Sequence, residues 1–170
     1  MKKLNDIYHS AAELEAQGVH VFSTDEKCGV QAREHKKPKH HAKPGKPERI
    51  DPEYVRHGTS GVIASIHVTS GEIVAPLVQP TRTEEDYSQH IKDVIATYPD
   101  GRYIFINDRL NTHMSETLVK LVAEHEGITD DLGVKGKSGI LKNMETRAAF
   151  LQDPSHKRML VQYTNSPSTQ

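Results

Sequence analysis

Two carboxylates, Asp25 and Asp108, each follow a short segment of the chain that has the pattern of a β-strand. Residues 19–24 alternate apolar and polar side chains as a half-buried strand does, and residues 103–106 are apolar or aromatic throughout. Since ligands of open α/β sheets bind at the carboxyl ends of strands, we expect the two carboxylates to meet if these strands are neighbours. Two carboxylates suit hard divalent cations, and a pair of such ions can cleave a phosphodiester. The competing interpretation is that each Asp merely begins a turn.

The elements that must position these acids follow from the periodicity of the remaining sequence. Residues 5–17 predict a short amphipathic helix that stops at Gly18, and residues 60–78 predict a β-hairpin with its turn at residues 69–71. Pro76 would place the second hairpin strand at a sheet edge or bulge, and His67 is expected to face outward. Later segments predict three helices and a final strand, at residues 83–98, 115–126, 144–151 and 158–163.

This order of elements indicates a single α/β domain. A strand, a hairpin and then alternating helices and strands describe a mixed sheet with helices packed on its faces. That is the layout of a ribonuclease-H-like domain. Residues 128–140, which are rich in Gly and Lys, lack the spacing of a phosphate-binding loop and are expected to form a surface connection.

A basic loop is expected at residues 31–50, where the periodicity is lost. It contains seven cationic side chains against Glu34 and Glu48: Arg33, Lys36, Lys37, Lys39, Lys43, Lys46 and Arg49. Such a loop matches a nucleic-acid backbone, because each neutralised phosphate releases condensed counterions. The alternatives are a solvated connector and, more weakly, a metal site at His35, His40 and His41, whose spacing fits no defined metal motif.

The composition of the chain excludes several classes of protein. The chain has 170 residues, a net charge of −1 and a hydrophobic content of 35%, which suits one domain with a lean core. The single Cys28 excludes an intrachain disulfide, and no apolar run reaches the ~20 residues that span a bilayer. The start of the chain lacks the apolar segment of a secretory signal. We therefore expect a cytoplasmic protein with no membrane contact.

Four segments of the sequence carry a resemblance to a known family: T-D-E-K-C-G-V-Q-A at 24–32, Y-V-R-H-G-T at 54–59, D-R-L-N-T-H at 108–113 and D-D-L-G-V-K-G-K-S-G-I-L at 130–141. From about Val19 onward the chain resembles the catalytic domain of bacterial insertion-sequence transposases of the mariner-like superfamily. The resemblance implies a ribonuclease-H-like DDE/D domain that acts on transposon-end and target DNA in the bacterial nucleoid, with two Mg²⁺ or Mn²⁺ ions. It assigns Asp25 and Asp108 as the first two catalytic, metal-binding acids, and Asn111 and His113 as residues that support the site.

The sequence also departs from the pattern of this family. Where the family continues into W-L-N-Q-x-E, whose Glu is the third acid, this chain reads N-S-P-S-T-Q after Thr164. Glu26 could in principle lend an oxygen, but the alternation of side chains along a strand is expected to point it away from the site. We therefore expect residues 1–18 to be a remnant of a linker to a missing DNA-binding domain, and residues 19–170 to be a truncated catalytic domain.

Three functions are compatible with these observations. The first is a transposase fragment whose ancestral reaction is metal-dependent DNA cleavage and strand transfer, working as a homodimer or with a complementing fragment. The second is an inactive remnant that binds DNA through the basic loop or binds partner subunits. The third is a different metal-dependent phosphoesterase built on the same sheet.

Overall fold

The computed structural model describes residues 4–38, 41–48 and 52–164. The helices and strands follow one another along the chain as α1 (Leu4–His9), α2 (Ala11–Ala16), β1 (Val19–His35), β2 (Tyr54–His67), β3 (Ile73–Gln79), α3 (Glu84–Thr97), β4 (Arg102–Asn107), α4 (Glu116–Glu126), β5 (Gly133–Val134), β6 (Ser138–Gly139), α5 (Met144–Leu151) and β7 (Met159–Tyr163). Two 3₁₀ turns, η1 (Thr112–Met114) and η2 (Ile140–Lys142), precede α4 and α5. Among these described residues, no helix is long and apolar enough to cross a membrane.

The main sheet has five strands in the order β3-β2-β1-β4-β7. The strands β1, β2 and β3 are antiparallel neighbours, whereas β4 runs parallel to both β1 and β7. This arrangement confirms the mixed, ribonuclease-H-like sheet expected from the sequence. It also makes β1 and β4 neighbours, which is the condition under which Asp25 and Asp108 could meet.

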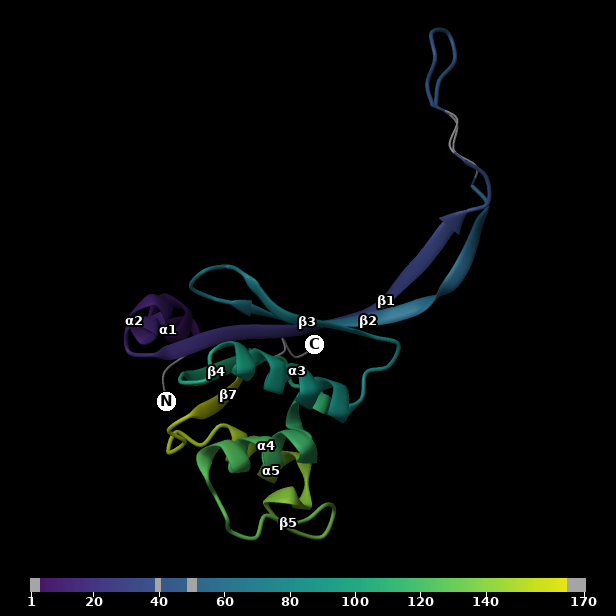
Figure 1. Ribbon diagram of the computed structural model, residues 1–170. Coiled ribbons are helices and arrows are strands. Elements are labelled where there is room, and N and C mark those ends of the chain that lie inside the picture. Colours follow the sequence, from purple (N-terminus) through teal and green to yellow (C-terminus); the bar gives the residue numbers. More distant parts are fainter. Residues whose placement is uncertain (1–3, 39–40, 49–51, 165–170) are drawn as a thin grey trace, which may run out of the picture.

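Helices cover both faces of this sheet (Figure 1). On one face, side chains such as Phe22 and Phe105 pack with apolar residues of α3, α4 and α5 into the larger core. On the other face, Val21 and Ile106 pack against α1 and α2. Adjacent residues of β1 and β4 thus enter different cores, because successive side chains of a strand point to opposite faces.

Local sequence signals fix the ends of the helices as expected. The Thr83 side chain accepts a hydrogen bond from the backbone of Asp86, and the Asp86 side chain accepts one from the backbone of Thr83, which forms a capping box at the start of α3. At the start of α4, the Ser115 side chain accepts a hydrogen bond from the backbone of Leu118. Gly127 ends this helix in the left-handed conformation that glycine adopts without strain.

The first strand is much longer than the sequence predicted. Instead of ending at Thr24, β1 continues to His35 and pairs with β2 as far as the pair of His35 with Tyr54. The resulting two-stranded ribbon projects beyond the rest of the sheet (Figure 1). We use the term arm for the described residues 27–38, 41–48 and 52–60. The prediction of a loop at residues 31–50 is therefore wrong for residues 31–35. These residues lack the periodicity of a strand, but their antiparallel pairing with β2 makes them part of one.

The hairpin and the Gly-rich segment also differ from expectation in detail. As predicted, β3 lies at the sheet edge, and its pairing with β2 is irregular opposite Ala75 and Pro76. His67 does not face outward but is buried. In the expected surface connection at 128–140, β5 and β6 form a small hairpin of their own.

Candidate active site

Asp25 and Asp108 each lie two residues beyond the last pair of the parallel β1–β4 ladder, which joins Ser23 to Ile106. Asp25 lies inside β1 rather than at its end, but the pairing of β1 with β4 stops at Ser23. The two acids therefore lie where the parallel part of the sheet ends.

Asp108 is held by the residues that follow it. Its Oδ1 atom lies 2.7 Å from Nδ1 of His113 and accepts a hydrogen bond of 3.3 Å from the backbone N–H of Leu110, while Nδ1 of His113 donates a hydrogen bond of 3.2 Å to the Asp108 carbonyl. The Asp108 side chain is 40% exposed, whereas the His113 side chain is fully buried. Asp108 is thus oriented from the protein side by a fixed imidazole and faces solvent on its other side.

Glu26 also reaches this imidazole, which corrects the expectation that its side chain points away from the site. Its Oε1 atom lies 3.4 Å from Nε2 of His113 and 3.5 Å from the hydroxyl oxygen of Thr112, and its Oε2 atom lies 3.4 Å from Arg82. The Glu26 side chain is only 2% exposed. Alternation does turn Glu26 to the face opposite Asp25, but η1 brings His113 beneath that face, so Glu26 and Asp108 contact one ring.

The electrostatics of this arrangement favour an ion pair between Glu26 and His113. The contact with His113, followed by weaker effects of Arg82 and Thr112, holds the pKa of Glu26 below its usual value despite burial. Burial disfavours the imidazolium, yet the contacts with Glu26 and Asp108 outweigh it and raise the pKa of His113. A protonated His113 donates from both ring nitrogens, which suits a carboxylate on each side.

Aromatic residues enclose the imidazole. The Tyr87 ring lies against that of His113 with centroids 4.3 Å apart, and the Tyr163 hydroxyl donates a 2.8 Å hydrogen bond to the His113 carbonyl. Burial raises the pKa of Tyr87 and Tyr163, so both hydroxyls stay protonated. This packing fixes the position of His113 and, through it, of Asp108.

A pocket of about 270 Å³ opens next to this cluster. Its lining comes from Glu26, Arg82 and the segment 109–112, which includes Asn111. Asn111 is exposed and contacts η1 through its carbonyl, which accepts a hydrogen bond from the Met114 backbone. Of the two residues expected to support the site, His113 therefore touches Asp108, and Asn111 lines the pocket beside it.

Those of the expected DNA-binding side chains that the structure describes lie on the arm and at its tip. The Arg33 guanidinium lies 4.6 Å from the centre of the Tyr54 ring, and Arg56, which the sequence did not single out, lies 5.6 Å from the same ring. Lys36 pairs with Glu53 at 3.1 Å. Lys37, Lys43 and Lys46 are exposed near the tip, while Lys39, Arg49 and His40 lie outside the described residues.

Two of the functional contacts could not be found from sequence. Arg82 precedes the N-cap of α3 and carries no motif, yet it reaches both Glu26 and, at 2.8 Å, the sulfur of Cys28. Glu26 was expected to point away from the site, because side chains alternate along a strand. Alternation gives the face to which a side chain points, but not the element that packs against that face.

The family model described as "DDE superfamily endonuclease" matches residues 20–161. No curated protein matches the chain. Among solved structures, the chain is similar to the Mos1 transposase paired-end complex with left transposon end (TM-score 0.42) and to the Mos1 mariner paired end complex with Mn (TM-score 0.41). Each is 15% identical and aligns with 71% of this chain, which spans 38% of the solved chain's length. Since the family model covers most of its residues, the chain belongs to the DDE superfamily endonucleases.

Proposed function

We propose that this chain is the catalytic part of a DNA transposase of the mariner-like, insertion-sequence type. Its reaction would be metal-dependent cleavage and strand transfer of DNA phosphodiesters. The observation that supports the proposal is that Asp25 and Asp108 each follow the end of the parallel β1–β4 pairing by two residues, within a DDE superfamily domain. DNA, as transposon ends and target, is the proposed partner, together with a second copy or a complementing polypeptide.

The acids at the end of the β1–β4 pairing fit a pair of Mg²⁺ or Mn²⁺ ions. Both Asp25 and Asp108 present carboxylate oxygens, the donors that these hard cations prefer. His113 contacts Oδ1 of Asp108, so metal coordination by Asp108 would fall to Oδ2. When bound, two such ions activate the attacking oxygen and stabilise the leaving oxygen of the phosphodiester.

The other residues of the site position these acids. His113 holds Asp108 from the buried side and bridges it to Glu26. Glu26 lies within ion-pair distance of both His113 and Arg82. The Arg82 side chain lines the pocket and is half exposed, so it can also approach a DNA phosphate.

A nicking assay on supercoiled plasmid DNA with Mn²⁺ tests the proposal. We expect the wild-type chain to nick the plasmid, and Asp25→Asn and Asp108→Asn to lower the rate by at least about 100-fold, because each removes a metal ligand. Asp100→Asn, a change of an exposed acid in the loop before β4, is the matched control and should nick as the wild type does.

Calorimetric titration with Mn²⁺ separates the possible failures of this assay. If Mn²⁺ binding depends on Asp25 and Asp108 but no nicking occurs, the result would support the metal site. Catalysis would then require a complex with the complementing polypeptide. Nicking that persists in both Asn variants, or Mn²⁺ binding that neither variant weakens, would overturn the proposal.

A further inference from the structure

A second cluster of potential ligands lies near the start of β1, away from Asp108. It joins Glu15 of α2, His20 of β1 and His67 at the end of β2. The Nε2 atom of His67 lies 3.4 Å from Nδ1 of His20 and 3.6 Å from Oε1 of Glu15, and the three ligand atoms all lie within 4.8 Å of one another. In the part of the chain that the structure describes, no other group of three such side chains comes as close together.

The spacing of these atoms fits a tetrahedral metal ion. Zn²⁺ binds imidazole nitrogen at about 2.0–2.1 Å and carboxylate oxygen at a similar distance, so neighbouring ligand atoms of a tetrahedral site lie about 3.3–3.5 Å apart. The two separations from Nε2 of His67, 3.4 and 3.6 Å, are close to this value. We propose that Glu15, His20 and His67 form a Zn²⁺ site, separate from the carboxylate site at Asp108.

Ser70 can set the tautomer of His67 for this role. The Nδ1 atom of His67 lies 3.0 Å from the hydroxyl oxygen of Ser70, which lies 3.4 Å from Glu72. A Ser70 hydroxyl that donates to Glu72 accepts the proton of Nδ1 and leaves the lone pair of Nε2 facing His20 and Glu15. A metal-binding imidazole is characteristically oriented by a hydrogen bond of this kind from its other nitrogen.

The two imidazoles are also fixed by packing. The Tyr98 ring lies 4.4 Å from the His20 ring and 5.5 Å from the His67 ring. Gly101 leaves room for His20, because a Cβ atom at this position would lie 2.7 Å from Cδ2 of that ring. Little ordering would therefore be needed on metal binding.

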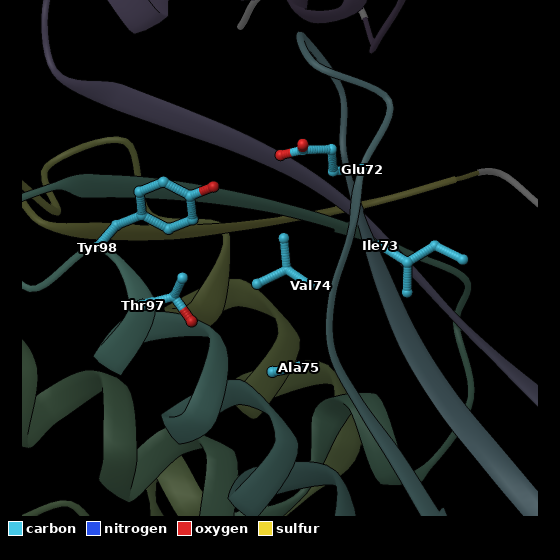
Figure 2. A pocket seen from close by; sticks show the side chains of 6 residues that line it. All are labelled: Glu72, Ile73, Val74, Ala75, Thr97 and Tyr98. Atoms are coloured by element: carbon cyan, nitrogen blue, oxygen red, sulfur yellow. The ribbon is translucent and has the colours of Figure 1, made fainter.

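A pocket of about 490 Å³ lies beside two residues that contact the cluster. Glu72 and Tyr98 line this pocket together with Val74 (Figure 2), and the same two residues contact the cluster through Ser70 and by ring packing. The Glu15 side chain is 35% exposed, so one side of the cluster faces water. A site with three protein ligands and an open fourth position for water is a known zinc geometry.

A bound Zn²⁺ would join α2 to β1 and β2, since its ligands come from all three elements. Imidazole ligands favour Zn²⁺ over Mg²⁺, so the ion at this cluster would differ from those at the carboxylate site. The expected consequence is a stabilising link between the N-terminal helices and the sheet that does not depend on the nicking reaction.

Calorimetric titration of the chain with Zn²⁺ in excess Mg²⁺ tests this site, because Mg²⁺ occupies the carboxylates at Asp108. We expect one equivalent of Zn²⁺ to bind, and Zn²⁺ at about 100 times its Kd to raise the Tm by about 5–10 °C. Co²⁺ in place of Zn²⁺ should give the intense visible absorption of a tetrahedral nitrogen and oxygen site.

Two surface variants keep the test independent of folding. Glu15→Gln should lower Zn²⁺ affinity by at least about tenfold, and Ser70→Ala by about 10–100-fold through the orientation of His67. Their matched controls are Glu13→Gln on the same helix and Thr69→Ala in the same turn, which should bind Zn²⁺ as the wild type does. The absence of Zn²⁺ binding, or binding that Glu15→Gln and Ser70→Ala leave unchanged, would overturn the proposal in favour of a plain ion pair between Glu15 and His67.

Discussion

The buried imidazole of His113 lies 2.7 Å from the partly exposed carboxylate of Asp108 and so links this acid to the protein interior. The same ring contacts Glu26 through its other nitrogen. The carboxylate oxygens of a metal-binding acid must be held in a fixed orientation. Here the side chain of His113, five residues further along the chain, orients the carboxylate of Asp108. Two substitutions of His113 can separate the effect of its contact with Asp108 from that of its contact with Glu26.

We expect His113→Asn to keep Mn²⁺ affinity close to that of the wild type and His113→Gln to lower it by about 10–100-fold. The reason is that the amide of Asn can replace Nδ1, which contacts Asp108, whereas the amide of Gln can replace Nε2, which contacts Glu26. Calorimetric titration with Mn²⁺ measures the difference, and circular dichroism shows that both variants are folded. Equal affinities of the two folded variants would contradict a positioning role for the Asp108 contact.

Acidification should destabilise the protein through His90. This ring lies 2.8 Å from the Ser65 hydroxyl and 2.9 Å from the Ala75 carbonyl, and burial lowers its pKa. Because the unfolded chain then binds the proton more readily, the stability that His90 contributes is complete above its ordinary pKa and is lost as the pH falls below it. Urea denaturation at pH 7.5 and at pH 5.5 should show a larger drop in the free energy of unfolding for the wild type than for His90→Gln. His9→Gln, a change of an exposed histidine on α1, should retain the drop of the wild type.

The arm should bind DNA through its charge. Removing several of its cations should reduce the slope of log affinity against log salt by about 0.9 for each phosphate that the variant no longer neutralises. The test variant replaces with Gln the residues Lys36, Lys37, Lys43 and Lys46. A control variant of the same net charge replaces Lys92, Lys120, Lys137 and Lys142, which lie outside the arm.

Fluorescence anisotropy with a labelled duplex at several salt concentrations measures both slopes. A change confined to the arm variant supports binding by the arm. Equal slopes for both variants would mean that the duplex responds to overall charge alone.

The cap of α3 should contribute measurably to stability. Thr83→Ala removes the side chain that accepts the Asp86 N–H, and we expect it to lower the free energy of unfolding by about 1 kcal/mol. Thr83→Ser retains the hydroxyl and should lower it by clearly less. Urea denaturation of the three proteins gives the comparison, and an Ala variant as stable as the wild type would show that water replaces the cap without loss.

The sequence predicted the parts of the fold that depend on local patterns. The helices that begin near Thr83 and Ser115 and the strand that leads to Asp108 all occur where expected. Each depends on residues within about one turn of helix or one strand, and the periodicity of a single segment contains that information.

The contacts that the sequence did not reveal all depend on pairing between distant segments. Residues 31–35 carry no strand pattern, yet they extend β1 because β2 supplies hydrogen-bond partners along its length. His67 was expected outside because hairpin alternation does not show that α2, Tyr98 and His20 close over it. Glu26 could be placed only after η1 was seen to carry His113 beneath β1.

The length of β1 has a consequence for how this protein can evolve. One continuous strand contains both Asp25 and the first half of the arm, but none of the described residues between Lys27 and Ser60 is buried. Substitutions, insertions or deletions in the arm are thus free of the packing constraint that applies to the rest of β1. We expect related sequences to vary widely in the length and composition of the arm while they keep the residues on either side of it, so that specificity for nucleic acid can diverge without loss of the fold.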